Sequence, residues 1–204
     1  MRLGLFGGSF DPVHNGHLAL ADACAEQAAL DAVWFVPAAR QPLKPQGPRA
    51  SDAQRLEMLR LALTDRPQFE ASALEIDRGG VSYTVDTLAE IRAQLPESAL
   101  FFLMGADSLA EFPTWLRQAE ICALATPLVV RRAGSPEPDF DVLAPVVSAE
   151  RLEAIRQSQV EMPAVPISSS QIRQLIAKGG AWQEMVPTAV AEYIAAIGLY
   201  QESC

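Results

Sequence analysis

The chain has 204 residues, of which 50% are hydrophobic and 20% are charged. This length fits one domain with a sizeable core, and the apolar content excludes disorder as its main state. Acidic residues outnumber basic residues by 25 to 16, which gives a formal net charge of −9. This balance argues against binding to duplex nucleic acid or to an anionic membrane surface, because both depend on basic side chains. A small anionic substrate stays compatible, since local charge at a pocket counts for more than net charge.

The first part of the chain predicts a βαβ unit. Residues 2–6 are a short apolar run that ends at a glycine pair, which is typical of a buried strand. Pro12 can open the next helix, and the apolar spacing continues that helix to about Leu30. The β-branched and aromatic run 33–36 predicts a second strand. A strand, a glycine turn, a helix and a strand in this order indicate a parallel sheet.

Helices and strands continue to alternate after a loop. Residues 38–50 hold three prolines and one glycine, and the length of this segment suggests a functional flap. Ser51 and Gln54 form the pattern of a capping box, and the helix they begin should run to about Thr64. Further strands are expected at 69–76, 100–104 and 128–130, and further helices at 84–95, 169–177 and 188–197. Residues 133–148 lack periodicity and predict a linker or a variable insertion. We therefore expect an α/β fold, a doubly wound, Rossmann-like parallel sheet flanked by helices.

The cysteines and the N-terminus bear on location. Cys24, Cys122 and Cys204 are far apart and form no Cys-x-x-Cys pair, so we expect reduced thiols, with at least two in the core. No stretch is long and apolar enough to span a bilayer, and the N-terminus lacks the pattern of a secretory signal. These features predict a soluble, cytoplasmic protein.

The two histidines of the chain, His14 and His17, both lie in the segment 7–17, GGSFDPVHNGH. The segment follows the first strand, where glycines let the backbone approach a ligand and a helix start favours an anion. It matches neither a Walker A loop nor the dinucleotide-binding glycine pattern. The spacing predicts both imidazoles on one helix face. Three interpretations are open: core histidines, metal ligands together with Asp11, or a pair that binds phosphate. The third is favoured, because imidazoles donate hydrogen bonds to developing charge.

A second polar segment, 167–173, places three serines at a predicted helix start and an arginine one turn later. Serines at this position are also common caps, so the segment is ambiguous by itself. Together with the histidine segment it predicts a second phosphate cradle. Ser170 and backbone N–H groups would contact phosphate oxygens, and Arg173 would supply a bidentate fork.

These two segments carry a resemblance to a known superfamily. Gly-x-Phe-Asp-Pro-x-His-x-Gly-His followed by Ile-Ser-Ser-x-x-x-Arg resembles the nucleotidyltransferases that share a His-x-Gly-His motif with class I aminoacyl-tRNA synthetases. Within that superfamily, the chain is similar to the bacterial nicotinate-mononucleotide adenylyltransferases. The order and spacing of four further segments carry this closer resemblance, namely 82–88, 105–109, 112–115 and 186–200. The resemblance covers nearly the whole chain except about 133–160.

The resemblance implies a single nucleotidyltransferase domain over 1–204, with a small C-terminal helical part at about 165–204. It implies transfer of AMP from ATP to nicotinate mononucleotide, which gives nicotinate adenine dinucleotide (deamido-NAD) and pyrophosphate. The 5′-phosphate of the mononucleotide attacks the α-phosphorus of ATP in line and is already ionised, so catalysis rests on positioning and charge stabilisation. Mg²⁺ would be held mainly by phosphates and water. The expected partners are these small molecules, with no nucleic acid or membrane, and the expected state is a monomer or a weak homodimer.

The resemblance also assigns individual residues. The implied catalytic residues are His14, His17 and Arg173. The implied ATP-binding set is Gly7, Gly8, Ser9, Phe10, His14, His17, Gly105, Asp107, Ile167, Ser168, Ser169, Ser170 and Arg173. The implied mononucleotide-binding set is Lys44, Thr84, Asp107, Trp115, Leu116 and Arg132. Trp115 would stack on the nicotinate ring, whereas Trp34 and Trp182 are expected in the core. Thr84 and the backbone N–H of Leu116 would bind the nicotinate carboxylate, which favours the deamido substrate.

One segment departs from the family pattern, and two alternatives stay open. In the flap, Leu43 stands where the family often has histidine, and alanines replace asparagines. A pantetheine-phosphate adenylyltransferase would share both terminal motifs without needing 82–88 or 112–115. A non-catalytic nucleotide-binding sensor would keep the pocket, but the intact histidines argue against it.

Overall fold

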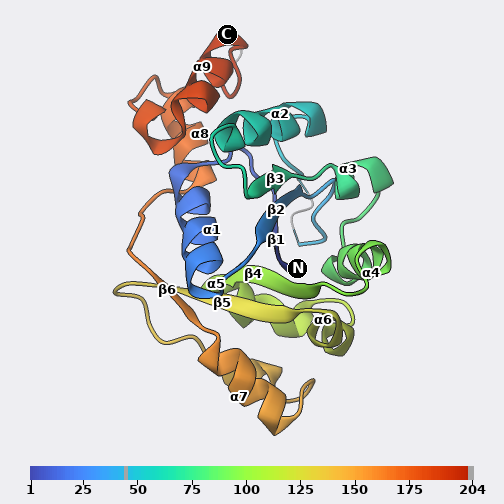
Figure 1. Ribbon diagram of the computed structural model, residues 1–204. Coiled ribbons are helices and arrows are strands. Elements are labelled where there is room, and N and C mark those ends of the chain that lie inside the picture. Colours follow the sequence, from blue (N-terminus) through green and yellow to red (C-terminus); the bar gives the residue numbers. More distant parts are fainter. Residues whose placement is uncertain (44–45, 202–204) are drawn as a thin grey trace.

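Within residues 1–43 and 46–201, which the computed structural model describes, six parallel strands form one sheet (Figure 1). The strands are β1 (Arg2–Gly8), β2 (Ala32–Pro37), β3 (Phe69–Ala71), β4 (Ala99–Gly105), β5 (Thr126–Arg132) and β6 (Val160–Met162). Their order across the sheet is β3-β2-β1-β4-β5-β6, and every neighbouring pair is parallel. The predicted doubly wound α/β fold is confirmed. The direction of winding reverses between β1 and β4, and open α/β sheets bind ligands at the carboxyl ends of such strands.

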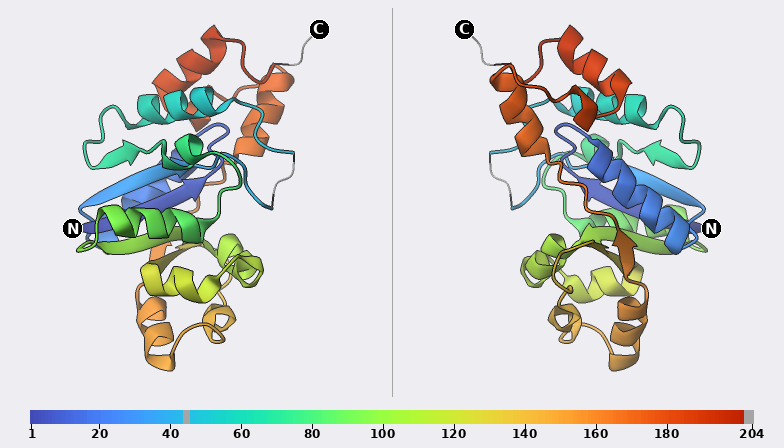
Figure 2. Two further views of the ribbon diagram at one scale, coloured as in Figure 1. Left: turned by 90° about the vertical axis from the view of Figure 1, so that its right-hand side faces the viewer. Right: turned by 90° about the vertical axis from the view of Figure 1, so that its left-hand side faces the viewer.

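Helices cover both faces of the sheet, as Figures 1 and 2 show. They are α1 (Asn15–Gln27), α2 (Asp52–Leu63), α3 (Leu74–Arg78), α4 (Thr84–Gln94), α5 (Ala106–Glu111), α6 (Gln118–Leu124), α7 (Ala149–Gln157), α8 (Ser169–Ala177) and α9 (Thr188–Ala196). Short 3₁₀ turns are η1 (Phe112–Thr114), η2 (Phe140–Leu143) and η3 (Gln183–Met185). On one face α1 and α2 pack with α8 and α9, and on the other face α4 to α7 form a second core. Among the described residues, none of these helices has the length and apolarity that a bilayer span requires.

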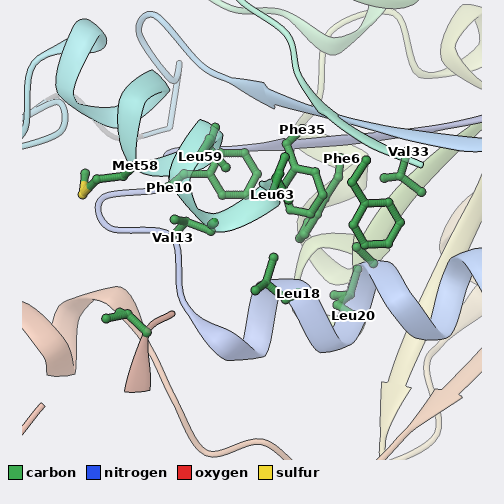
Figure 3. Close-up of a cluster of buried hydrophobic side chains, with 14 of the residues drawn as sticks. Phe6, Phe10, Val13, Leu18, Leu20, Val33, Phe35, Met58, Leu59 and Leu63 are labelled. Carbon is green, nitrogen blue, oxygen red and sulfur yellow. The ribbon is translucent and has the colours of Figure 1, made fainter. Parts of the chain in front are cut away.

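Alternating strand side chains divide the core between the two faces. Phe6 on β1 and Phe35 on β2 belong to the α1–α2 side, whereas their neighbour Leu5 belongs to the α4 side. Figure 3 shows Leu18 of α1 and Leu59 of α2 packed around these phenylalanines. Burial of each such side chain stabilises the fold by about 1.5–3 kcal/mol, so the apolar pattern holds the sheet and helices together.

The C-terminal helices lie beside the helices of the first half of the chain. α9 packs against α2, and α8 stands next to the start of α1 (Figure 2). The Ser51–Gln54 capping box of α2 is present as predicted. Of the cysteines, Cys24 and Cys122 are free and buried, which confirms two core thiols; Cys204 lies outside the described residues.

Several predicted boundaries were wrong. The strand expected at 69–76 ends at Ala71, and α3 follows it, because a five-residue helix leaves no periodicity that separates it from a strand. The first helix begins at Asn15, since residues 9–14 form an extended turn in which Phe10 has a φ of +48°. The segment 133–148 is no plain linker, because it contains η2 and leads into α7 and β6.

Candidate functional site

The turn between β1 and α1 is shaped by a glycine and a phenylalanine. A Cβ atom at Gly8 would lie 2.9 Å from Cζ of Phe10, so only glycine fits beneath this ring. Phe10 is buried, and its ring centroid lies 5.1 Å from that of His17. The Phe10 side chain therefore supports the histidine from the core, and only its backbone is left to face a ligand.

The two histidines occupy different positions from those predicted. His14 is the N-cap of α1 and lies outside the helix, whereas His17 is in its first turn. Their rings nevertheless stack, with centroids 3.7 Å apart. The backbone N–H of His14 donates to Nδ1 of His17 at 3.2 Å, so Nε2 carries the proton when the His17 ring is neutral. Gly16 makes the stack possible, because a Cβ there would lie 3.1 Å from the His14 ring.

The electrostatic surroundings keep His14 neutral. Burial and then the positive charge of Arg132 lower the pKa of the His14 imidazole to about 4. Its Nδ1 atom is buried without a hydrogen-bond partner among the described residues. Arg132, assigned to the mononucleotide by resemblance, thus exerts its charge at His14, from the carboxyl end of β5. At neutral pH the pair acts through hydrogen bonds rather than through a charge on His14.

The start of α8 meets the β1–α1 turn. Ser168 is the N-cap of α8 and accepts from the Gln171 N–H at 3.2 Å, so the capping role considered for these serines is real. Ser169 donates through Oγ to the Pro12 carbonyl at 2.9 Å. Arg173 donates to the Asp11 carbonyl at 2.6 Å, and also to Oγ of Ser170 at 3.2 Å. Two motifs at opposite ends of the chain therefore form one surface.

The metal-site interpretation finds no support in the contacts of Asp11. Its two carboxylate oxygens accept from the backbone N–H groups of Arg49 and Ala50, at 2.8 and 3.0 Å. In the part of the chain that the structure describes, no group of three or more His, Cys, Asp or Glu side chains is arranged to hold a metal ion. Asp11 acts as a structural acceptor.

A cavity of about 580 Å³ opens at the carboxyl ends of β1 and β4. Its lining includes six of the predicted site residues, Gly7, Gly8, Thr84, Gly105, Trp115 and Leu116. A Cβ at Gly105 would meet nothing within 4 Å, so glycine there leaves the space open. The Trp115 ring packs against Phe102 and Phe112, with centroids 5.6 and 5.4 Å away. The strand order thus brings residues 7 and 115 to one pocket.

Some predicted residues lie elsewhere. Asp107 is exposed in the first turn of α5 and is not among the described residues that line the cavity. Ile167 is half-buried and packs on the α1–α2 side of the core. Lys44 lies outside the described residues.

Other site residues escaped prediction. Gln41, in the flap, lines the cavity and accepts a hydrogen bond from Oγ of Ser9 at 3.1 Å. Arg55 is fully buried and donates to the carbonyls of Ser9 and Ala38 at 2.8 and 2.6 Å, which ties the flap to the β1–α1 turn. The sequence signal for Arg55 is one arginine on the apolar face of α2, and this pattern does not predict which groups the arginine contacts.

Comparison with known proteins places this chain in a family. Residues 5–175 match the family model described as Cytidylyltransferase-like. A probable nicotinate-nucleotide adenylyltransferase of Rhodopirellula baltica is 42% identical over 192 residues, which cover 94% of this chain and 90% of that protein. One of Thermomicrobium roseum is 42% identical over 200 residues, which cover 98% of this chain and 92% of that protein.

Solved structures show the same fold. The Plasmodium falciparum nicotinic acid mononucleotide adenylyltransferase complexed with NaAD aligns with a TM-score of 0.74 at 16% identity, over 98% of this chain and 97% of that one. A putative nicotinate-nucleotide adenylyltransferase of Vibrio parahaemolyticus aligns with a TM-score of 0.69 at 19% identity, over 100% of this chain and 98% of that one.

Proposed function

Because the chain belongs to the cytidylyltransferase-like family and, within it, to the nicotinate-nucleotide adenylyltransferases, it is an enzyme that transfers AMP from ATP to nicotinate mononucleotide in NAD biosynthesis, and we propose how its residues share that reaction. The ATP phosphates bind where the β1–α1 turn meets α8, and the mononucleotide binds in the cavity beside it. The contact of Arg173 with the Asp11 backbone carries this proposal, since it places the guanidinium at the β1–α1 segment that also holds the two histidines.

His17, His14 and Arg173 act on the phosphates of ATP. The Nε2–H of His17 donates to the phosphoryl group under transfer, since its Nδ1 is already an acceptor. His14 adds a second imidazole, which is neutral. Arg173 supplies a permanent positive charge that faces the leaving pyrophosphate. The start of α1 and the start of α8 add backbone N–H groups and favourable helix dipoles. These groups stabilise charge on the oxygens without removing a proton from the nucleophile.

The mononucleotide occupies the cavity. Trp115 stacks on the nicotinate ring, while Thr84 and the backbone N–H of Leu116 bind the carboxylate. Thr84 is the first residue of α4, so a carboxylate there also meets the positive end of a helix dipole. Gly7 and Gly8 line the cavity and belong to the segment that leads to the histidine pair, and this favours approach of the 5′-phosphate to ATP.

We propose that Mg²⁺ would enter with ATP and would be held mainly by its phosphates and by water. Asp11 is engaged by backbone donors, and the described residues offer no cluster of three protein ligands. Bound in this way, Mg²⁺ would neutralise phosphate charge. The protein residues then serve mainly to orient the oxygens.

We also propose that residues 1–204 act as one nucleotidyltransferase domain in the cytoplasm. The contacts of α8 with the β1–α1 turn support one functional unit, because the C-terminal part contributes to the same site. The buried free thiols of Cys24 and Cys122 suit a reducing compartment.

Release of pyrophosphate from ATP tests the proposed function. The purified chain is assayed with Mg²⁺ and nicotinate mononucleotide, nicotinamide mononucleotide, phosphopantetheine or no acceptor. We expect release with the first acceptor at the highest kcat/KM, together with formation of the dinucleotide. Preference for phosphopantetheine would instead support a pantetheine-phosphate adenylyltransferase. ATP binding without any turnover would support a non-catalytic nucleotide-binding sensor.

A further inference from the structure

A buried carboxylate joins three segments of the phosphate site. Asp11 is 3% exposed, and its Oδ1 accepts from the Ala50 N–H at 3.0 Å and from the Tyr200 hydroxyl at 2.7 Å. Its Oδ2 accepts from the Arg49 N–H at 2.8 Å. The same oxygen lies 3.6 Å from Nη1 of Arg173, which donates instead to the Asp11 carbonyl at 2.6 Å. The glycine segment, the end of the flap and the C-terminal segment therefore meet at one side chain.

Tyr200 reaches Asp11 through an unusual turn of the backbone. After α9, both Gly198 and Tyr200 adopt left-handed conformations, with φ of +62° and +67°. The N–H of Leu199 donates to the Ile194 carbonyl at 3.1 Å and closes the helix end. A left-handed conformation is unfavourable for a tyrosine, so its side-chain contacts must offset that cost. Tyr200 is 6% exposed, and among the described residues its hydroxyl makes one hydrogen bond, to Asp11.

The guanidinium of Arg173 is hydrogen-bonded to the Asp11 carbonyl and to Ser170, but not to the Asp11 carboxylate. A separation of 3.6 Å between Oδ2 and Nη1 is longer than a hydrogen bond, although the two groups carry opposite charges. Donors from Tyr200, Arg49 and Ala50 hold the Asp11 carboxylate in this orientation. Without the tyrosine hydroxyl, Oδ1 keeps only the Ala50 donor, so the carboxylate is held less firmly in this orientation and shifts more readily toward the guanidinium. A closer ion pair would then compete with the triphosphate for Arg173.

We propose that Tyr200 is a positioning residue for nucleotide transfer, which acts through Asp11 to keep Arg173 open to the phosphates of ATP. Burial and the negative charge of Asp11 raise the pKa of Tyr200, so the hydroxyl stays protonated and donates throughout the physiological pH range. This inference rests on the proposed role of Arg173 in ATP binding. It predicts that loss of the Tyr200 hydroxyl weakens the binding of ATP but not the binding of the mononucleotide.

The test compares Tyr200→Phe with Tyr193→Phe. Both variants lose one hydroxyl in the C-terminal segment, but Tyr193 is half-buried on α9 and makes no hydrogen bond through its hydroxyl within the described residues. We expect Tyr200→Phe to raise the KM for ATP by about 3- to 10-fold, the scale of one typical hydrogen bond, because the hydroxyl acts on ATP indirectly. The KM for nicotinate mononucleotide should stay within about 2-fold, and Tyr193→Phe should match the parent enzyme. Calorimetric binding of a non-hydrolysable ATP analogue gives the same comparison without turnover.

A second variant separates positioning from general loss of structure. In an Arg173→Ala background, Tyr200→Phe should cause no further loss of affinity for the ATP analogue, because the residue through which it acts is gone. The inference is overturned if the loss persists in that background. It is equally overturned if Tyr200→Phe weakens both substrates alike, or if it behaves like Tyr193→Phe. Failure of the parent enzyme to form the dinucleotide would instead refute the proposed function.

Discussion

Arg117 forms an ion pair with Asp86, and this contact ties the loop that carries Trp115 to the first turn of α4. Arg117 has a φ of +54°, in the left-handed region, directly after Leu116. The two walls of the cavity that we assign to the nicotinate ring and its carboxylate are therefore joined by one side chain. The spacing of these walls therefore depends on Arg117, which itself lines the cavity.

The first prediction concerns this ion pair. Arg117→Asn removes the charge but keeps a residue that tolerates the left-handed backbone. Exposed ion pairs contribute about 0–1 kcal/mol, so we expect a rise of about 2- to 5-fold in the KM for nicotinate mononucleotide and no change for ATP. Steady-state kinetics with each substrate varied measures both. Arg156→Asn, which breaks the exposed pair with Asp141 in the α7 region, is the matched control. An equal change in both KM values would contradict the role.

The second prediction concerns Trp115. Stacking of a base on an aromatic side chain is worth about 1–3 kcal/mol, so Trp115→Ala should raise the KM for the mononucleotide about 10-fold or more. ATP should be affected much less, since Trp115 lines the cavity and not the histidine pair. Trp115→Phe keeps a smaller ring, so its KM for the mononucleotide should lie between those of the parent enzyme and of Trp115→Ala. Equal losses for both substrates would refute the stacking assignment.

Local patterns predicted those parts of the fold that depend on neighbours in sequence. β1 and β4 are apolar runs that end at glycine, and α2 begins at its predicted capping box, because these signals act within a few residues. The strand order that places Gly7 and Trp115 in one cavity depends on long-range pairing, which no local pattern specifies. α3 was missed because five residues hold too little periodicity.

The same contrast holds within the site. The histidine and serine segments were found because each is a short motif with a chemical meaning. Arg55 was not, since its acceptors are backbone carbonyls, which any residue can offer. Tyr200 and Asp11 are separated by 189 residues, and a buried hydrogen bond across that distance leaves no trace in one sequence.

The third prediction is a pH dependence of stability that arises from His14. Its pKa is about 4 in the folded protein against an ordinary value of 6.5, so the unfolded chain binds more protons between these values. The free energy of unfolding therefore rises with pH in this window. The stabilisation is complete above about pH 6.5 and is lost as the pH falls toward 4, by about 3 kcal/mol at most. Urea unfolding at several pH values measures it.

His14→Gln supplies the control for this dependence. The variant has no titratable group at position 14, so its unfolding free energy should change less between pH 6.5 and 4 than that of the parent protein. Parallel curves for the two proteins would show that His14 is not buried in its neutral form.

The fourth prediction separates the two nitrogens of His17. An asparagine amide can replace Nδ1 as the acceptor for the His14 N–H, whereas a glutamine amide reaches the position of Nε2. We expect His17→Asn and His17→Ala each to lower kcat by about 100-fold or more, the scale of one lost donor to a developing charge. His17→Gln should keep more activity. The asparagine variant should unfold like the parent protein. A fully active asparagine variant would remove Nε2 from the mechanism.

The last prediction concerns the choice of mononucleotide. Thr84 and the Leu116 backbone offer hydrogen-bond donors, and α4 presents the positive end of its dipole. A carboxylate accepts from all of these groups, whereas a carboxamide must turn its own NH₂ toward a donor and leave that donor unpaired. One unpaired donor, together with the loss of the negative charge at the start of α4, should cost about 100-fold or more in kcat/KM for nicotinamide mononucleotide. Thr84→Val should reduce this preference and leave the KM for ATP unchanged, because the threonine donor is lost while the helix start remains. Comparable kcat/KM values for the two mononucleotides would mean that the carboxylate does not bind at the start of α4.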